Sequence, residues 1–156
     1  MRLDAIDVRL IAELQQDGRR PVVELAERVG LSATPCARRI HQLEQAGIIQ
    51  GYAASIDPAR LGLKVRAFVQ VKLERHTDEN VAQFRAALEA IDEVVSCDAT
   101  TGEHDFMLQV LVPDLESLSD IVLKRLLRIP CVRDLQSSLA LETMKRSSRL
   151  PLGHLR

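Results

Sequence analysis

The chain has 156 residues, of which 46% are hydrophobic, 28% are charged and 3% are aromatic, and its formal net charge at pH 7 is −1. This composition is typical of a globular protein and excludes a polycation, and the length is enough for one medium domain or two small ones. No apolar stretch approaches the roughly 20 residues that a membrane-spanning helix needs, so no membrane partner is expected.

Two further features indicate a cytoplasmic protein. The first ten residues, MRLDAIDVRL, contain acids where a signal peptide would be purely apolar, so secretion is not expected. The three cysteines, Cys36, Cys97 and Cys131, make no C-x-x-C pair and no disulfide framework, which fits a reducing compartment.

The first predicted element is a helix over Ala5–Gln16. Asp4 is a plausible N-cap, and Asp17-Gly18 ends the helix. One face of the helix is apolar and is formed by Ile6, Leu10, Ile11 and Leu14.

Residues 22–49 predict two short amphipathic helices joined by a tight turn. The first, Val22–Val29, ends at Gly30, which we expect to adopt the left-handed conformation. Ser32 then stands where an N-cap belongs, with its hydroxyl placed to accept a backbone N–H, and Pro35 falls in the first turn of the second helix. Gly47 closes that helix. The buried faces are formed by Val22, Leu25, Ala26 and Val29 in the first helix and by Cys36, Ile40 and Leu43 in the second.

The opposite face of the second helix is polar, and no acid occurs between Ser32 and Gln42. This is the layout of a helix-turn-helix, whose second helix enters the DNA major groove. Arginine suits this role because its planar fork matches guanine and phosphate. An ordinary pair of helices with a solvated basic face is the alternative interpretation. The predicted DNA-contacting residues are Ser32, Thr34, Pro35, Arg38, Arg39, His41 and Gln42.

A short strand is predicted near residues 52–56, followed by a turn at Asp57-Pro58. This strand is either a wing of the helix-turn-helix or the hinge into a second domain. Residues 51–63 form the strand and linker.

From residue 64 onward the apolar period changes from that of a helix to that of a strand. Residues 64–74 alternate, with Val65, Ala67, Val69, Val71 and Leu73 on one face. A helix over residues 78–90 follows, capped by Thr77, and its inward residues are Val81, Phe84 and Leu88. Two strands, at residues 93–101 and 105–112, are joined by a turn around Gly102.

A last helix is predicted from Pro113-Asp114 to about Arg128, and a last strand over residues 132–141. The inward residues of this helix are Leu115, Leu118, Ile121, Val122 and Leu126. The order βαββαβ is that of a ferredoxin-like unit, with two helices on one face of a four-stranded sheet. The other face keeps apolar residues, including Phe68, Met107 and Leu111, and is predicted to pair with a second subunit.

Together, the two halves resemble the leucine-responsive regulator/AsnC (feast/famine) family of transcription regulators over nearly the whole chain, from about Leu3 to Leu152. The matching pieces are LDAIDVRLIAELQQDGR, VELAERVGLSATPCARRIHQLEQAGII, GYAASIDPARLG, TGEHDFMLQV, IPCVRDLQSSLAL and RLPL. The chain departs from the family at Pro21, where a polar helix cap is usual, and at Ala37, where a larger apolar residue is frequent.

The resemblance implies an α+β protein with a (winged) helix-turn-helix DNA-binding domain at residues 1–50 and a linker at 51–63. A ferredoxin-like effector-binding and oligomerisation domain follows at 64–142, and a tail at 143–156. The implied function is sequence-specific transcription regulation, with assembly or DNA affinity modulated by a small molecule, usually an amino acid. The implied partners are double-stranded DNA with a pseudo-palindromic operator and further copies of the chain, as a homodimer or a larger assembly such as an octamer. A ligand-independent or architectural DNA-binding member and a stand-alone amino-acid-binding module are the alternatives.

In the resembled family, a Gly-x-x-Asp hairpin lines the effector cleft between neighbouring dimers, and Gly102 and Asp105 match it. Asp105 and backbone carbonyls would accept from the ammonium of an amino acid, while hydroxyls and backbone N–H groups would bind its carboxylate. Alternatively, Gly102 only makes a hairpin turn and Asp105 caps it. The predicted effector site comprises Thr101, Gly102, Glu103, His104, Asp105, Ser137 and Ser138.

An enzyme is not predicted, although Cys97, Glu103, His104 and Asp105 are close in sequence. Adjacent residues of a strand point to opposite faces, which separates His104 from Asp105. No phosphate loop, H-E-x-x-H or nucleophile elbow occurs. The four histidines, His41, His76, His104 and His154, have no metal-ligand spacing, so neither a metal nor a cofactor is expected.

Overall fold

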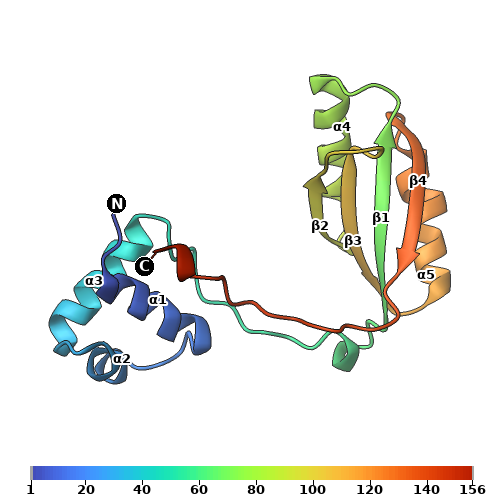
Figure 1. Ribbon diagram of the computed structural model, residues 1–156. Coiled ribbons are helices and arrows are strands. Elements are labelled where there is room, and N and C mark those ends of the chain that lie inside the picture. The colour runs from blue at the N-terminus through green and yellow to red at the C-terminus, as the bar shows by residue number, and fades with distance from the viewer. Residues whose placement is uncertain (1, 156) are drawn as a thin grey trace. The chain divides into compact units, whose positions relative to one another are not determined.

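The structure, a computed structural model, describes residues 2–155 and divides into two compact units (Figure 1). One unit combines the chain up to Ser55 with the residues from Met144 onward, and the other comprises Ile56–Thr143. No helix within the described range is long and apolar enough to cross a membrane.

The first unit contains the three predicted helices, α1 (Ala5–Gln16), α2 (Val22–Val29) and α3 (Ala33–Gln45). Their apolar faces meet in one small core, as the helical spacing predicted, except that Val22 is 37% exposed and lies outside it. At most 8% of each core side chain is exposed, and these residues are Leu10, Leu25, Ala26, Val29, Cys36, Ile40 and Leu43.

The helix ends agree with the sequence in two cases and differ in one. Asp4 caps α1 as predicted, and Gly30 has a φ of 76°, in the left-handed region. Ser32 occupies the N-cap position of α3, but its side chain makes no capping hydrogen bond, so that prediction is wrong. Pro35 is the third residue of α3 and has no N–H, which removes one of the two donors that a capping hydroxyl normally bonds.

The predicted strand at residues 52–56 is also wrong, because this segment has no regular structure. A strand needs a neighbour to satisfy its backbone groups, and the described part of the chain supplies none here. Tyr52 instead anchors the segment, with its hydroxyl donating to Glu44 Oε1 at 3.0 Å.

The C-terminal tail returns to the first unit. The backbone N–H of Leu150 donates to the side-chain oxygen of Gln15 on α1, and a short 3₁₀ turn, η4 (Gly153–Leu155), follows. Leu152 and Leu155 line a cavity beside α1.

The second unit has the predicted βαββαβ order and forms one four-stranded antiparallel sheet, β2-β3-β1-β4 (Figure 1). Its strands are β1 (Val65–Leu73), β2 (Val94–Ala99), β3 (Phe106–Val112) and β4 (Val132–Leu139). Its helical segments are η1 (Ala59–Leu61), α4 (Asp78–Leu88) and α5 (Leu115–Asp120), which continues through η2 (Ile121–Arg125) and η3 (Leu126–Arg128). The ferredoxin-like prediction is confirmed.

The segment after β3 is a helix up to Arg128, as predicted, but its pitch changes along its length. It starts as an α-helix, passes through a π-helical turn at Ile121–Arg125 and ends as a 3₁₀ turn. The wide π turn brings Leu126 into phase with Ile121, and both are buried. Leu115 lies about 120° from that face at 100° per residue, which explains why it is 60% exposed and why its predicted inward position is wrong.

The alternation predicted for β1 is confirmed. The side chains of Ala67, Val69, Val71 and Leu73 face the helices and are at most 3% exposed. On this side, Phe84 of α4 packs against Phe106 of β3 with a ring-centroid distance of 5.0 Å. These contacts form the core of the second unit.

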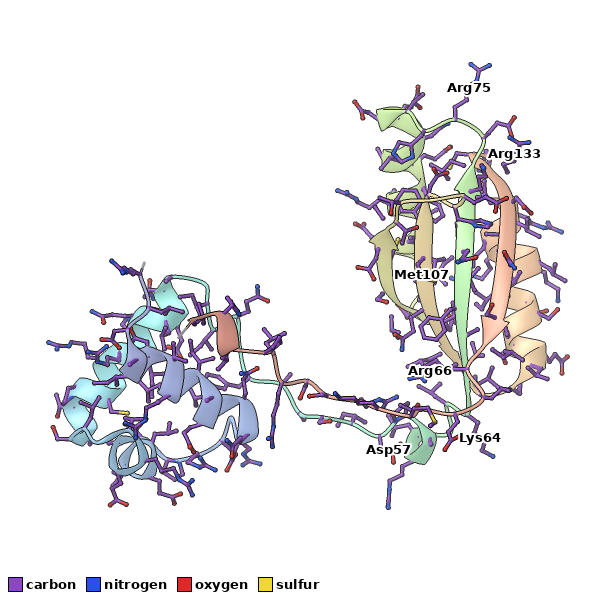
Figure 2. The ribbon with its side chains drawn as sticks, viewed as in Figure 1. Asp57, Lys64, Arg66, Arg75, Met107 and Arg133 are labelled. Carbon is purple, nitrogen blue, oxygen red and sulfur yellow. The ribbon has the colours of Figure 1, made fainter. Side chains whose placement is uncertain are left out.

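The face of the sheet opposite the helices carries the predicted apolar residues, but polar residues separate them. Phe68 is 36% exposed and lies opposite Gln109 and Ser138 on the neighbouring strands. Met107 lies opposite Gln70 and Asp98. Figure 2 shows Met107 on β3 and Arg66 near the start of β1. We call the face of the sheet opposite the helices, which carries Phe68 and Met107, the open sheet face.

Candidate nucleic-acid interface and effector site

Most of the predicted DNA-contacting residues lie on the solvent-exposed, polar face of α3. Pro35 is half-buried, and the exposed residues are Ser32, Thr34, Arg38, His41 and Gln42. The first turn of α3 contains no acid, so its positive dipole end is not neutralised by an acid of that turn. Further along, the His41 imidazole lies 3.8 Å from the Glu44 carboxylate.

Arg39 is the exception: it was predicted on the solvent side of α3, but its guanidinium turns to α1. Its Nη1 donates to Asp4 Oδ2 and to Asp7 Oδ1 of α1, both at 2.7 Å, and only 27% of its side chain is exposed. These hydrogen bonds raise the pKa of Arg39, and the bond to Asp7 has the larger effect. The Asp7 backbone N–H, together with Arg39, lowers the pKa of Asp4. The acids Asp4 and Asp7 at the start of α1 were visible in the sequence. Their pairing with Arg39 was not, because it depends on the tertiary contact between α1 and α3.

The hairpin between β2 and β3 contains five of the seven predicted effector residues. Gly102 has a φ of 118°, a conformation that L-residues rarely adopt, so glycine is needed at this turn. Thr101, Gly102 and Glu103 are exposed, whereas His104 and Asp105 are half-buried.

Asp105 is held by its own chain. Its Oδ2 accepts the backbone N–H of Leu73 at 2.8 Å, where the β1–β4 register shifts, and its Oδ1 lies 3.5 Å from His76 Nδ1. Its own N–H donates to the carbonyl of Val71. The carboxylate therefore caps the end of β1.

Ser137 and Ser138 lie away from the hairpin within one chain. Ser138 pairs with Phe68, which is on the open sheet face, and Ser137 pairs with Val69, which faces the helices. The hairpin adjoins Val71, two to three residues further along β1. At about 3.3 Å per residue this offset is roughly 7–10 Å along the strand. The structure does not bring the two parts of the predicted effector site together in a single subunit.

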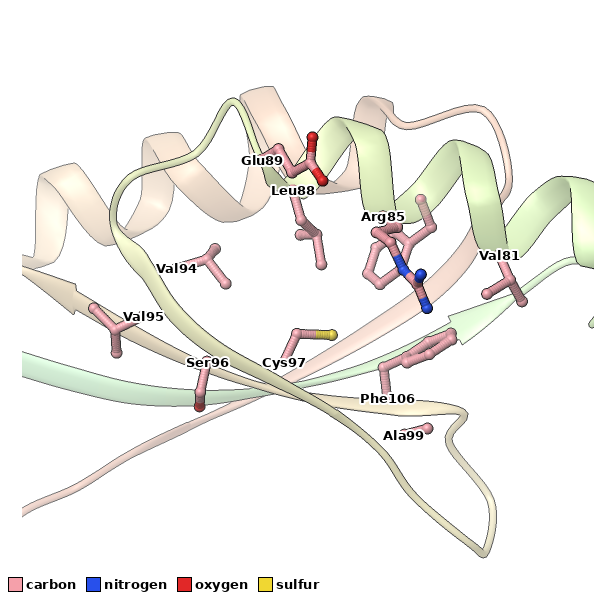
Figure 3. A pocket seen from close by; sticks show the side chains of 11 residues that line it. Val81, Arg85, Leu88, Glu89, Val94, Val95, Ser96, Cys97, Ala99 and Phe106 are labelled. Atoms are coloured by element: carbon pink, nitrogen blue, oxygen red, sulfur yellow. The ribbon is translucent and has the colours of Figure 1, made fainter. Parts of the chain in front are cut away.

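A cleft of about 350 Å³ between α4 and β2 is a feature that the sequence did not reveal (Figure 3). Arg85 of α4 and Glu89, the residue that follows α4, carry its charges, and Cys97 of β2 also lines it. Burial raises the pKa of the Cys97 thiol, and Asp98 raises it further. Of Arg85, Glu89 and Cys97, only Cys97 was singled out from the sequence. The apolar lining is formed by Val81, Phe84, Leu88, Val94 and Phe106.

No group of three or more metal-ligating side chains lies together in the region from residue 2 to residue 155. The two units and their surfaces define a regulator with a helix-turn-helix for DNA and a ferredoxin-like domain. The model of the AsnC-type helix-turn-helix domain matches residues 3–44, and that of the Lrp/AsnC ligand binding domain matches residues 66–150. The chain belongs to the Lrp/AsnC family of transcription regulators.

Individual relatives are similar to this chain along nearly their full length. The leucine-responsive regulatory protein of Salmonella typhimurium is 40% identical over 95% of this chain and 90% of its own length, and that of Escherichia coli K12 is 39% identical over the same shares. A transcriptional regulator from Neisseria meningitidis, solved in complex with L-Met, is 42% identical with a TM-score of 0.94 over 99% of both chains. An AsnC family transcriptional regulator from Agrobacterium tumefaciens is 34% identical with a TM-score of 0.91, over 97% of this chain and 99% of its own.

These relatives are transcription regulators and not enzymes, as predicted for this chain. The chain is a DNA-binding transcription regulator with a helix-turn-helix domain and a ligand-binding domain.

Proposed function

We propose that the chain binds a pseudo-palindromic operator as a homodimer or a larger assembly in the cytoplasm, and that an amino acid alters its assembly or its DNA affinity. The family match over both units carries this proposal, and the L-Met complex of the related Neisseria regulator supports an amino acid as effector. A ligand-independent DNA-binding member is the alternative, and ligand titration separates the two.

We propose that α3 enters the major groove with the solvent face that carries Arg38. Its exposed residues lie opposite the buried stripe of Cys36, Ile40 and Leu43, so they can approach DNA without disturbing the core. The proposed contacts are Ser32, Thr34, Pro35, Arg38, His41 and Gln42. Arg39 is not among them, because its guanidinium is bound to α1.

The Arg38→Ala variant is expected to weaken operator binding, because Arg38 is the exposed arginine of the α3 face. A bidentate base contact would cost about 1–3 kcal/mol and relax one position of the site. A phosphate contact would weaken all sequences alike and reduce the salt slope of log K by about 0.9. Fluorescence anisotropy at several salt concentrations measures both, and Arg60→Ala in the exposed η1 turn is the matched control. Wild-type affinity and salt slope in Arg38→Ala would contradict this use of α3.

For the effector, we propose an interface site in which the hairpin of one subunit faces Ser137 or Ser138 of a neighbour. Two subunits are needed because these residues lie apart within one chain. Asp105 Oδ1 is the proposed partner of the ammonium group. His76, its neighbour at 3.5 Å, is 60% exposed at the side chain and so can move aside.

The Asp105→Asn variant is expected to lose amino-acid binding while it keeps its fold and its ligand-free DNA affinity. Asparagine retains an oxygen for the Leu73 N–H but removes the charge that would pair with the ammonium. Asp105→Ala is expected to be less stable in addition, by about 1–3 kcal/mol, because that N–H loses its partner. Calorimetry with each of the twenty amino acids, with and without DNA, is the measurement. If Asp105→Asn binds the same amino acid as the wild type with equal affinity, the charge has no role in the site.

A further inference from the structure

Two carboxylates, Asp4 and Asp7, lie at the N-terminus of α1. Each uses one oxygen to cap the helix and the other to bind Arg39. Asp4 Oδ1 accepts the backbone N–H groups of Ile6 and Asp7, both at 2.9 Å, and Asp7 Oδ2 accepts that of Asp4 at 3.0 Å. This reciprocal capping box uses one oxygen of each acid. The other two oxygens, Asp4 Oδ2 and Asp7 Oδ1, both accept from Nη1 of Arg39, each at 2.7 Å.

The burial of Asp7 explains why its ion pair with Arg39 matters for folding. Asp7 is 4% exposed, which makes it the one buried charged residue of the described chain. A carboxylate removed from water must be hydrogen-bonded and paired with a cation. Arg39 is the cation that contacts it, so the place of Asp7 in α1 determines where this residue of α3 must lie.

The apolar contacts between α1 and α3 do not define the rotation of α3 equally well. Hydrophobic attraction is non-directional, whereas a charge-assisted hydrogen bond is short and geometrically demanding. Consecutive residues of a helix are 100° apart, so the inward direction of Arg39 also sets the direction in which Arg38 leaves the helix.

We infer that Arg39 is a positioning residue, which orients α3 on α1 for base recognition and contacts no DNA itself. The inference rests on the proposed reading of DNA by α3. Base contacts require a more exact orientation than phosphate contacts, so loss of Arg39 lowers the preference for the operator over other DNA.

The test compares full-length Arg39→Gln, Asp7→Asn and Arg38→Gln with the wild type. The probes are a duplex selected by the wild-type protein from random sequence and a scrambled duplex of equal length. Anisotropy titrations at four salt concentrations give the specific-to-scrambled affinity ratio and the salt slope. Circular dichroism at the assay temperature establishes that each protein is folded.

Arg39→Gln and Asp7→Asn are both expected to lower the affinity ratio, on the order of tenfold, with the salt slope on scrambled DNA unchanged. The double variant is expected to be no worse than either single one, because the two side chains act through one contact. Arg38→Gln is expected to differ by lowering the salt slope or by relaxing one base position.

The opposite behaviour would overturn the inference. If Arg39 contacted DNA, Asp7→Asn would remove a competing carboxylate and tighten binding, and Arg39→Gln would reduce the salt slope by about one. A wild-type protein that selects no sequence would instead refute the proposed DNA reading itself.

Arg39→Lys keeps the test decisive if the neutral variants unfold. A single nitrogen of Arg39 serves both carboxylates, so one ammonium can replace it. Arg39→Lys is therefore expected to keep the affinity ratio within about twofold of wild type, whereas a bidentate guanine contact would not survive this change. A tenfold loss in folded Arg39→Lys would refute the positioning role.

Discussion

Replacing Met107 with aspartate is expected to dissociate the protein into monomers and to weaken operator binding with it. Met107 lies on the open sheet face, where its neighbours across the strands are Gln70 and Asp98. If a second subunit covers this face, the new carboxylate is buried beside the like charge of Asp98. An unpaired buried charge costs about 3–5 kcal/mol, and a symmetric interface contains the substitution twice.

Such a loss would shift the dimer dissociation constant by several powers of ten, since each 1.4 kcal/mol is a factor of ten. Operator affinity would fall because two reading helices no longer bind the two half-sites together. Analytical ultracentrifugation at micromolar concentration measures the first effect and anisotropy the second. Leu123→Asp, at a helical position that is already 56% exposed, is the control and is expected to remain wild-type in both. An unchanged dimer in Met107→Asp would show that the open sheet face is not the interface.

Phe84→Ala is expected to destabilise the second unit by about 3–5 kcal/mol, because it removes a large side chain that is almost fully buried. Phe84 is 1% exposed and contacts Phe106 at a ring-centroid distance of 5.0 Å. Domains are stable by only about 5–15 kcal/mol, so this one change takes a large share.

Urea unfolding followed by circular dichroism is the measurement for Phe84→Ala, with Val95→Ala, a residue that is 50% exposed, as the control. We expect the unfolding midpoint of the second unit to move to a lower urea concentration. A loss below about 1 kcal/mol would mean that α4 does not depend on this contact.

The sequence predicted those features that depend on neighbouring residues in the chain. The alternation of Val69 and Val71 follows from the two-residue period of a strand, and the ends of α2 and α3 follow from glycine and from apolar spacing. For this reason the helices of the first unit and the βαββαβ order of the second were correct.

Apart from the Ser32 cap and the exposure of Val22, the errors concern distant partners or an unusual helical turn. A strand near Tyr52 failed because strand propensity cannot provide a pairing neighbour. Leu115 was placed inward because a regular α-helix was assumed where a π turn occurs. Arg39 was expected to be exposed because its partners, Asp4 and Asp7, lie more than thirty residues earlier.

The turn at Gly102 was predicted and is observed, whereas the effector site built from Thr101–Asp105, Ser137 and Ser138 remains a prediction. Adjacent residues of a strand point to opposite faces, so Ser137 and Ser138 lie on different sides of β4. Their distance from the hairpin required the strand order, which follows only from the assembled sheet.

The return of the chain to the first unit after Thr143 has a consequence for cooperativity. The exit of the second unit is held against the start of β1, since Ala140 N–H donates to the Arg66 carbonyl and Arg66 Nη2 donates to Thr143 Oγ1 at 2.8 Å. While this unit is folded, the tail that bonds Gln15 is presented to α1 at a high effective concentration. Once it unfolds, the tail is connected only through the long flexible loop of residues 56–143, and effective concentration falls steeply with loop length. Folding of the second unit is therefore expected to favour the contact between the tail and α1 through chain entropy.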